Sequence, residues 1–289
     1  MLITTYPSFR EVMAKGNLVR LAGAHSALGG ALVEEAGFDA VWASSLEISA
    51  GRRLPDASLL TMTDYLAAAE QIQSSVGVPV VADVDTGFGG NLNVAHMVRE
   101  YERAGITAVC IEDKHFPKMN SFVDQGDQGQ ILMDAEAFCE KLRIAKSVQE
   151  SPEFYLIART ETYISGMGTD EALRRCAMYA DAGADAVLVH SKIKDPSQVE
   201  EFLAAWDGRV PVVIVPTTYP DWHATDAHRA GVSVIIYANQ ALRATVQAVS
   251  DTLRVIKEKG TSTPVEDEIA PIAEVFRLQK LQAWTALDA

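Results

Sequence analysis

Carboxylate side chains close two of the apolar segments that read as buried strands. Asp83 and Asp85 end the segment 78–85, and Glu112 ends the segment 108–113. Alternation along a strand places Asp83 and Asp85 on the same side, where two carboxylates repel each other unless a cation or a proton lies between them. Such oxygen ligands suit Mg²⁺, which usually takes one or two protein carboxylates and keeps several waters. These three residues therefore predict a magnesium site.

Cationic side chains follow the next two strand-like segments. Arg159 lies near the end of one, and His190 closes the other. The chain carries a net charge of −14, so an anionic substrate would need a local positive site to overcome the general repulsion. Arg159 and His190 could supply it, since a guanidinium binds phosphate or carboxylate in a fixed geometry. The alternative is that these charges are ordinary strand ends meeting water.

A polar segment leaves one of the carboxylate-bearing strand ends. Residues 113–127, DKHFPKMNSFVDQGD, are too polar and too broken for a helix of the same kind as the others. Lys118, Asn120 and Ser121 within it are suited to contact phosphate or carboxylate oxygens. A long polar loop over an active site is often a lid, and an ordinary surface loop is the alternative reading.

The elements that must position these residues are short, β-branched apolar segments, which are typical of buried parallel strands. The eight segments are 19–24, 39–44, 78–85, 108–113, 155–160, 186–190, 210–216 and 232–238. Helical patterns separate most of them, at 26–36, 62–75, 92–104, 134–149, 169–182 and 196–206. Ala-Gly pairs at 36–37, 104–105, 182–183 and 230–231 mark helix ends that return to a strand.

Eight strand–helix units with right-handed crossovers predict an α/β fold, a (β/α)₈ TIM-type barrel, whose active site lies at the carboxyl ends of the strands. A doubly wound open sheet is the alternative, weakened because no G-x-G-x-x-G follows the first strand. We expect the barrel to span residues 1–258. Residues 259–289 would form a linker and a C-terminal helix, 269–287, with one apolar face. That face must be buried on the barrel or on a neighbouring subunit, which favours a homo-oligomer.

Composition excludes several classes of protein. Hydrophobic residues make up 48% and charged residues 22% of the chain, as in a globular protein with a sizeable core. The acidic balance argues against nucleic acid and anionic membranes as partners, and the longest apolar stretches are too short to span a bilayer. Three cysteines without a C-x-x-C pair indicate neither a disulfide framework nor a zinc knuckle. We expect a cytoplasmic protein acting on a small molecule.

Longer stretches of the chain resemble a known superfamily. The stretches are WASSLEISA (42–50), ADVDTGFGG (82–90), EDKHFPKMNSF (112–122), IARTETYISG (157–166), HSK (190–192) and VIVPTTY (213–219). From about residue 8 to residue 279 the chain resembles the phosphoenolpyruvate mutase/isocitrate lyase superfamily, and within it the mutases. The resemblance implies Mg²⁺-dependent interconversion of phosphoenolpyruvate and phosphonopyruvate, with C–P bond formation for phosphonate biosynthesis. It also implies dimers or tetramers in which the C-terminal helix is exchanged between subunits.

The same resemblance implies roles for individual residues. Asp85 looks like the principal Mg²⁺ ligand, largely through water, with Asp83 and Glu112 supporting the hydrated ion and Asp56 nearby. The implied substrate pocket and catalytic groups are Trp42, Ser44, Leu46, Arg159 and His190, together with Lys118, Asn120, Ser121 and Phe122 of a gating loop. Within that loop, Asn120 is positioned against the moving phosphoryl group.

Alternative activities stay open at this point. Isocitrate and methylisocitrate lyases carry a catalytic cysteine in the corresponding loop, whereas DKHFPKMN has none. Phosphonopyruvate hydrolase shares the metal site but typically carries threonine where this chain has Asn120. Other 2-oxo-acid chemistry and a barrel that has become a binding protein are more distant options. The polar sequence RTETY (159–163) and the residues Tyr237 and Gln240 depart from the mutase pattern and could tune the pocket.

Overall fold

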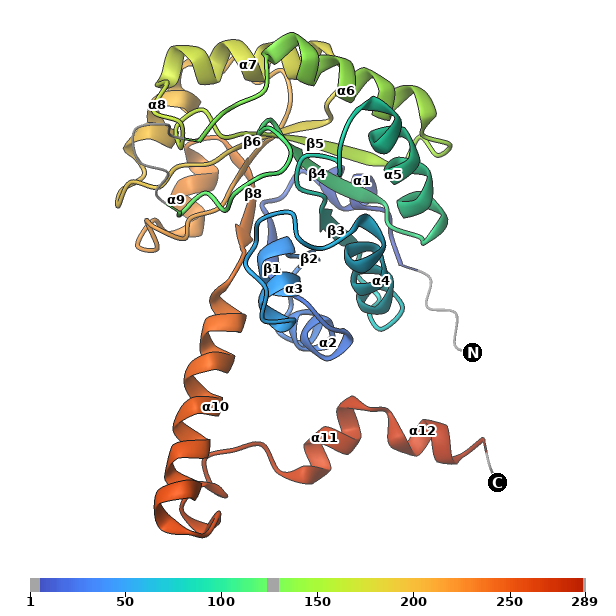
Figure 1. Cartoon of the computed structure of the whole chain (residues 1–289), viewed down its shortest axis with the longest axis vertical. Coiled ribbons are helices and arrows are strands. Elements are labelled where there is room, and N and C mark those ends of the chain that lie inside the picture. Colours follow the sequence, from blue (N-terminus) through green and yellow to red (C-terminus); the bar gives the residue numbers. More distant parts are fainter. Residues whose placement is uncertain (1–5, 124–129, 288–289) are drawn as a thin grey trace. The chain divides into compact units, whose positions relative to one another are not determined.

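The computed structural model describes residues 6–123 and 130–287, so residues 124–127 of the predicted polar loop lie outside the described residues. Within these ranges the strands close into a barrel in sequence order, β1 to β8 (Figure 1). All neighbours are parallel, and β8 pairs with β1. The predicted (β/α)₈ barrel is confirmed.

Two of the strands, β1 and β5, have the predicted bounds, and the other six are shorter than the apolar segments that predicted them. They are β1 Val19–Ala24, β2 Ala40–Ala43, β3 Val80–Asp83, β4 Ala108–Glu112, β5 Tyr155–Thr160, β6 Ala186–Val189, β7 Val212–Ile214 and β8 Val232–Tyr237. The helices of the barrel unit are α1 Phe9–Met13, α2 Ala27–Glu35, α3 Ser45–Gly51, α4 Met62–Gln73, α5 Asn91–Arg103, α6 Ala135–Val148, α7 Thr169–Asp181, α8 Ser197–Ala205 and α9 Ala224–Arg229.

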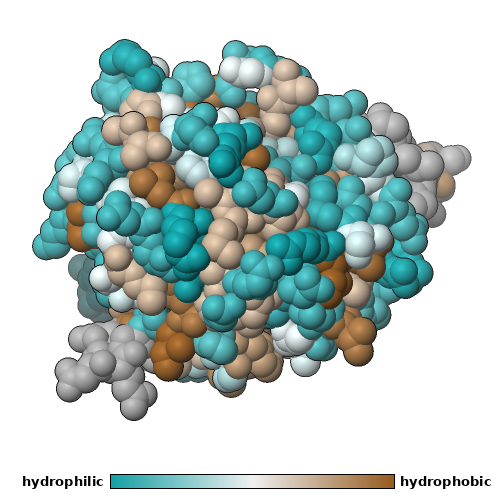
Figure 2. All heavy atoms as spheres, turned by 90° about the horizontal axis from the view of Figure 1, so that it is seen from above, coloured by the Kyte–Doolittle hydropathy of each residue, from teal (hydrophilic) through white to brown (hydrophobic). Residues whose placement is uncertain are grey.

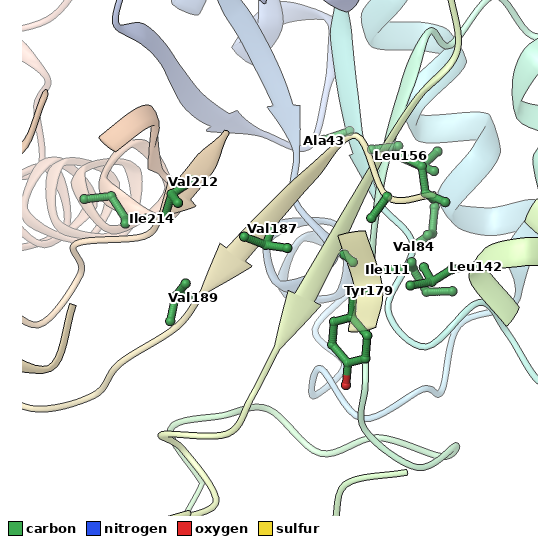
Figure 3. Packing of buried hydrophobic residues seen from close by; sticks show 14 of the residues in the cluster. Ala43, Val84, Ile111, Leu142, Leu156, Tyr179, Val187, Val189, Val212 and Ile214 are labelled. Carbon is green, nitrogen blue, oxygen red and sulfur yellow. The ribbon is translucent and has the colours of Figure 1, made fainter. Parts of the chain in front are cut away.

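Alternation along each strand divides the core into two parts. One set of strand residues, including Leu21, Trp42 and Ile157, packs together in one cluster, which Phe9 of α1 joins. The other set packs with side chains from the surrounding helices, such as Leu142 of α6 and Tyr179 of α7 (Figure 3). The first set is the barrel interior, and the second is the layer between the sheet and the helices. Only the strand residues on the interior side of this alternation can therefore reach the pocket at the barrel mouth.

The helix-to-strand returns form where the Ala-Gly pairs predicted them. Gly37, for example, has φ +80° and Gly105 has φ +81°. This left-handed conformation is inexpensive only for glycine, and it ends each helix so that the chain can turn into the next strand.

The chain divides into two compact units, Met1–Asn239 and Gln240–Ala289. The second unit contains α10 Gln240–Lys259, a 3₁₀ turn Thr263–Val265, α11 Ile272–Leu278 and α12 Leu281–Thr285. Contacts within the chain thus group α10 with the C-terminal segment. None of the residues of α10 is buried in the single chain.

The expectation of one continuous helix over 269–287 is wrong. Lys280 adopts a left-handed backbone conformation, φ +54°, between α11 and α12. A non-glycine residue in this region interrupts the helical hydrogen-bond ladder. The apolar residues Ile272, Phe276 and Trp284 of these two helices are exposed in the single chain.

The surface is mainly hydrophilic on the face that can be seen. Hydrophilic residues predominate on the face shown in Figure 2, with smaller apolar areas between them. No helix in the described part of the chain is long and apolar enough to cross a membrane.

Candidate active site

A pocket lies where the carboxyl ends of the strands meet, and we call it the central pocket. It is lined by Trp42, Ser44, Ser45, Leu46, Asp56, Asp83, Lys118, Asn120, Ser121, Phe122, Arg159, His190, Val215, Thr217, Ala238 and Asn239. Every residue that was predicted to bind substrate or to be catalytic is among them. Of the three predicted metal ligands, Asp83 lines the pocket. Asp85 and Glu112 are buried in contact with residues that line it, Asp85 with Lys118 and Glu112 with Arg159.

Lys118 is the centre of the acidic side of the pocket. Its ammonium lies 2.7 Å from Asp56 Oδ1 and 2.8 Å from Asp85 Oδ1. Burial alone would lower the pKa of this lysine, but the carboxylates of Asp85 and Asp56 hold it well above its ordinary value. Lys118 therefore carries a fixed positive charge beside a group of buried carboxylates.

The two aspartates of the D-x-D sequence differ in environment. Asp83 ends β3 and accepts a hydrogen bond from Ser45 Oγ at 2.8 Å. Asp85 lies beyond the strand with φ +49°, so the prediction that simple strand alternation relates the two side chains is wrong. Burial raises the pKa of Asp85 to about 7, against the opposing effect of Lys118. Burial also raises the pKa of Asp83.

The loop that presents Asp85 is supported from outside the barrel. Lys141 of α6 is buried and donates to the carbonyl oxygen of Thr86 at 2.9 Å. Desolvation lowers the pKa of Lys141 to about 8. Nothing in the sequence pointed to this residue, because a lysine in an amphipathic helix normally lies on the solvated face.

The carboxylates of Asp83, Asp85 and Glu112 are suited to bind a hydrated Mg²⁺ ion. Asp83, Asp85 and Glu112 are all buried, and Glu112 Oε1 has no hydrogen-bond partner within the described residues. In residues 6–123 and 130–287, no three His, Cys, Asp or Glu side chains converge closely enough to hold a metal by themselves. An ion here would be completed by waters and substrate oxygens, which is the usual arrangement for Mg²⁺.

Glu161 organises the basic side of the pocket. Its carboxylate lies 2.5 Å from Arg159 Nη2, 2.9 Å from His190 Nδ1 and 3.2 Å from Lys114 Nζ. Burial would raise the pKa of Glu161, but Arg159, Lys114 and His190 together hold it well below its ordinary value. Glu161 is thus ionised and fixes two of the predicted substrate contacts, Arg159 and His190.

His190 presents one ring nitrogen without a partner. Its Nδ1 contacts Glu161 and lies 2.9 Å from Arg159 Nη2. Its Nε2 is buried with no hydrogen-bond partner in the described structure. Burial lowers the pKa of His190, against the attraction of Glu161. A neutral imidazole carries one N–H. In the tautomer with the proton on Nε2, Nδ1 accepts from Arg159 Nη2 and Nε2 can donate to an anionic oxygen.

The two sides of the pocket are joined by the segment 118–122. Asn120 Nδ2 donates to Asp56 Oδ2 at 2.7 Å, and its Oδ1 accepts from the backbone N–H of Phe122 at 3.0 Å. Ser121 Oγ lies 2.7 Å from Lys114 Nζ and 3.2 Å from Arg159 Nη2. The polar loop therefore covers both charge clusters with its own side chains.

Ser44 and the residue after it begin α3. The Ser44 hydroxyl accepts from the backbone N–H of Glu47 at 3.3 Å and caps the helix. Helix N-termini favour anions because their first N–H groups have no partner within the helix. The opposite wall carries Thr217 and Asn239, which are 3.1 Å apart and follow β7 and β8.

Sequence reasoning left out Ser45, Val215, Thr217, Ala238 and Asn239 as pocket residues, and gave Glu161 no role. Their position directly after strands is the signal that could have found most of them. Residues at which the sequence departs from the mutase pattern include Thr160, Thr162 and Tyr237, and these lie outside the pocket lining. Thr160 and Thr162 are buried and do not line the central pocket, and Tyr237 packs with Phe38 on the outer side of the sheet.

Comparisons with known proteins agree with this geometry. The family model described as phosphoenolpyruvate phosphomutase matches residues 9–257. A phosphoenolpyruvate phosphomutase from Tetrahymena pyriformis is 41% identical over 270 residues, which cover 93% of this chain and 89% of the relative.

Solved structures are similar over nearly the whole length. A phosphoenolpyruvate phosphomutase from Streptomyces platensis subsp. rosaceus has a TM-score of 0.94 and 50% identity, with 96% of each chain covered. A phosphonopyruvate hydrolase in complex with oxalate and Mg²⁺ has a TM-score of 0.90 and 38% identity, again with 96% of each chain covered. The chain therefore belongs to the phosphoenolpyruvate mutase family, within the phosphoenolpyruvate mutase/isocitrate lyase superfamily.

Proposed function

We propose that this enzyme is a Mg²⁺-dependent phosphoenolpyruvate mutase, an isomerase that interconverts phosphoenolpyruvate and phosphonopyruvate. The observation that carries the proposal is Asn120, whose side chain lines the central pocket together with Arg159 and His190 and donates to Asp56. An amide in this pocket can contact a transferring phosphoryl group in addition to the cations. The mutase relatives at 41% and 50% identity support the same reading.

The reaction needs no proton, oxidant or co-substrate. The P–O bond of phosphoenolpyruvate breaks, which leaves a pyruvate enolate and a metaphosphate-like group, and C3 of the enolate then forms the C–P bond. Because the transferring group is loosely bonded in the transition state, the protein acts mainly by positioning and by stabilising charge. Mg²⁺, when bound, supplies Lewis-acid stabilisation of the enolate oxygen.

The residues of the chain divide this work between the two sides of the pocket. Arg159 and His190 Nε2 hold the oxygens of the phosphoryl group, and Asn120 contacts it from the loop. The N-terminus of α3, capped by Ser44, receives the carboxylate end, while Trp42 and Leu46 provide an apolar wall. Lys118 holds the pKa of Asp56 below its ordinary value and opposes the rise that burial causes in the pKa of Asp85. Water must be kept from the transferring group, because its attack would give pyruvate and phosphate.

Phosphonopyruvate hydrolase is the second candidate. It is favoured by a specific finding, the similarity to a solved hydrolase at 38% identity over 96% of the chain. The two activities differ in whether C3 or water captures the phosphoryl group, so they require the same cations and the same metal. Asn120, in place of the threonine expected in a hydrolase, leads us to prefer the mutase.

Lyase chemistry has less support. The lyases of this superfamily are expected to use a cysteine in the loop over the pocket. All three cysteines of this chain, Cys110, Cys139 and Cys176, are buried, and none lines the central pocket. Their buried thiols, free of disulfides, fit the reducing cytoplasm that we propose for the enzyme.

We also propose that the enzyme is a homo-oligomer in which the C-terminal segment is exchanged between subunits. Val246, Val249 and Leu253 of α10 are each more than half exposed in the single chain, at 60%, 51% and 61%. The barrel has a groove on its outer side lined by residues that include Leu18, Trp222 and Tyr237. Arg20, His223 and Thr225 also line this groove, so it offers apolar contacts together with polar ones. An apolar helix face and a partly apolar groove on identical subunits are suited to cover each other.

A coupled assay separates the two candidates. Purified enzyme receives phosphonopyruvate and Mg²⁺, followed by pyruvate kinase and ADP, so that ATP reports phosphoenolpyruvate, while a colorimetric assay reports inorganic phosphate. The mutase proposal predicts ATP well in excess of phosphate. Phosphate without ATP would establish the hydrolase and would overturn the role given to Asn120.

A further inference from the structure

A second buried polar cluster lies behind the pocket, on the side of the sheet that faces the helices. Asp113, which follows β4, is fully buried. Its Oδ2 accepts hydrogen bonds from Tyr179 OH at 2.7 Å, from Thr160 Oγ1 at 2.9 Å and from Arg175 Nη1 at 3.3 Å. Tyr179 and Arg175 are one turn apart on α7, and Nη1 of Arg175 lies 3.1 Å from the tyrosine hydroxyl. Tyr179 and its hydroxyl are visible in Figure 3.

Strand parity explains why this cluster exists beside the pocket without lining it. Side chains alternate along a strand. Glu112, Arg159 and Glu161 hold the positions that face the barrel interior. The residue after each of the first two, Asp113 and Thr160, and likewise Thr162, therefore faces the outer layer. Thr160 and Thr162 also hydrogen-bond to each other. Thr160 and Thr162 of RTETY thus belong to the cluster around Asp113 and do not line the pocket, whereas Arg159 of the same sequence does.

The cluster is joined to the phosphoryl-binding side by two hydrogen bonds that involve backbone groups. Asp113 Oδ1 accepts the backbone N–H of Glu161 at 2.9 Å, and the backbone N–H of Asp113 donates to the carbonyl of Arg159 at 3.1 Å. Glu161 in turn holds both Arg159 and His190 through its carboxylate. A displacement of Asp113 would therefore move the residue on which the orientation of both cation sites depends.

The same cluster holds the two ends of the polar loop. The backbone N–H of Met133 donates to the carbonyl of Asp113 at 2.8 Å, and Arg175 Nη1 donates to the carbonyl of Met133 at 2.9 Å. Lys114, which follows Asp113, and Leu132, which precedes Met133, form an isolated antiparallel β-bridge. Arg175 and Asp113 thereby connect α7, the Glu161 turn and the base of the loop that carries Lys118 and Asn120.

A purely structural role does not require such polarity. A buried network of ionised groups is seldom more stable than well-packed apolar side chains of similar volume, so it is weak support for a role in stability alone. Polar networks with every member satisfied do, however, restrict their neighbours to one geometry. Active-site groups need positions fixed to within a fraction of an ångström.

We propose that Asp113, held by Arg175 and Tyr179, is a positioning residue that fixes Glu161 and through it the Arg159–His190 pair for phosphoryl transfer. This inference rests on the proposed function, because it assigns the pair to the phosphoryl group. Asp113 itself touches neither substrate nor metal, and its effect passes through the backbone N–H of Glu161.

The test compares two single-atom deletions at buried tyrosines. Tyr179→Phe removes one donor to Asp113 and keeps the ring that packs on Phe138. Tyr163→Phe is the matched control, because its hydroxyl donates to the carbonyl of Gln198 at 2.8 Å, away from Asp113. Total turnover of phosphonopyruvate, the sum of phosphoenolpyruvate and phosphate, is measured with saturating Mg²⁺, together with Tm and the inhibition constant of oxalate.

The inference predicts that kcat of Tyr179→Phe falls about tenfold, as expected for losing one hydrogen bond to a charged group. The product mixture should shift toward phosphate. Oxalate has no phosphoryl group, so its inhibition constant should stay that of the wild type, and Tyr163→Phe should keep wild-type kcat. Equal kcat in both variants, or a parallel loss of oxalate affinity, would overturn the inference. No turnover in the wild-type enzyme would instead refute the proposed function.

Discussion

Replacing Lys118 by methionine tests how the acidic side of the pocket is balanced. Methionine has a similar length but no charge, so the substitution removes the ammonium between Asp56 and Asp85 with little change in packing. Three contacts disappear, at 2.7 and 2.8 Å from the two oxygens of Asp56 and at 2.8 Å from Asp85. The carboxylates of Asp56, Asp83 and Asp85 would then lie together without a nearby lysine.

The magnitude follows from burial. Removing one partner of a buried ion pair typically costs about 3–5 kcal/mol of unfolding free energy, because the other charge is left buried and alone. Protonation of the carboxylates would reduce this loss of unfolding free energy. In the wild type, burial already raises the pKa of Asp85 to about 7, against the opposing effect of Lys118. Burial also acts to raise the pKa of Asp56, but Lys118 and Asn120 hold it below its ordinary value.

Loss of Lys118 raises the pKa of the Asp56 and Asp85 carboxyls in the folded state above their pKa in the unfolded chain. The folded variant then binds more protons than the unfolded one, so its stability falls as pH rises toward the folded-state pKa. The difference in unfolding free energy between wild type and Lys118→Met should therefore be smallest near pH 5 and should widen to roughly 3–5 kcal/mol near pH 8. Excess Mg²⁺ should stabilise the variant more than the wild type.

Urea unfolding across this pH range, with and without Mg²⁺, measures both effects. Lys141→Met is the matched control, since Lys141 is also buried but donates to the carbonyl of Thr86 and pairs with no carboxylate in the described structure. Its difference from wild type should be flat from pH 5 to about pH 7, because Lys141, with a pKa of about 8, stays protonated there in both the folded and the unfolded chain. A loss in Lys118→Met that is independent of pH, and equal to that of the control, would refute the reasoning.

Three further outcomes are expected. Asn120→Ala removes the amide that contacts Asp56 and the transferring group, and kcat should fall by about 10²–10³, as when one preorganised donor is lost at a transition state; steady-state kinetics with near wild-type activity would contradict this. Chelation by EDTA should abolish turnover of phosphonopyruvate and added Mg²⁺ should restore it, whereas turnover that survives chelation would exclude the metal role of Asp83, Asp85 and Glu112. Truncation after residue 262 should give a smaller species in size-exclusion chromatography, and an unchanged elution volume would argue against exchange of the C-terminal segment.

The barrel could be predicted from the sequence because its signals are local. Buried parallel strands need β-branched apolar segments, and each helix return needs glycine, so segments such as 210–216 and pairs such as Ala104-Gly105 identify their elements without tertiary information. The central pocket followed because parallel strands in a barrel deliver their carboxyl ends to one rim. Trp42, Arg159 and His190 reached the pocket for this reason alone.

What the sequence could not predict depends on contacts between distant segments. Asp85 lies beyond the end of β3 with a left-handed backbone and pairs with Lys118, whereas the D-x-D sequence predicted an extended strand through both aspartates. The role of Glu161 arises from three partners on separate strands and loops. Lys141 looked like a surface lysine, and the break at Lys280 carries no glycine or proline to announce it. Thr160 and Thr162 look like pocket substitutions until strand parity places them on the outer layer.

The most direct test of the mutase is ³¹P NMR of the purified enzyme with phosphonopyruvate and Mg²⁺. The C–P and P–O–C phosphorus signals are distinct from each other and from inorganic phosphate, so substrate and both candidate products are followed in one sample. We predict a phosphoenolpyruvate signal that grows as phosphonopyruvate disappears, with little free phosphate. Inorganic phosphate growing in without phosphoenolpyruvate would contradict the assignment and identify the enzyme as a hydrolase.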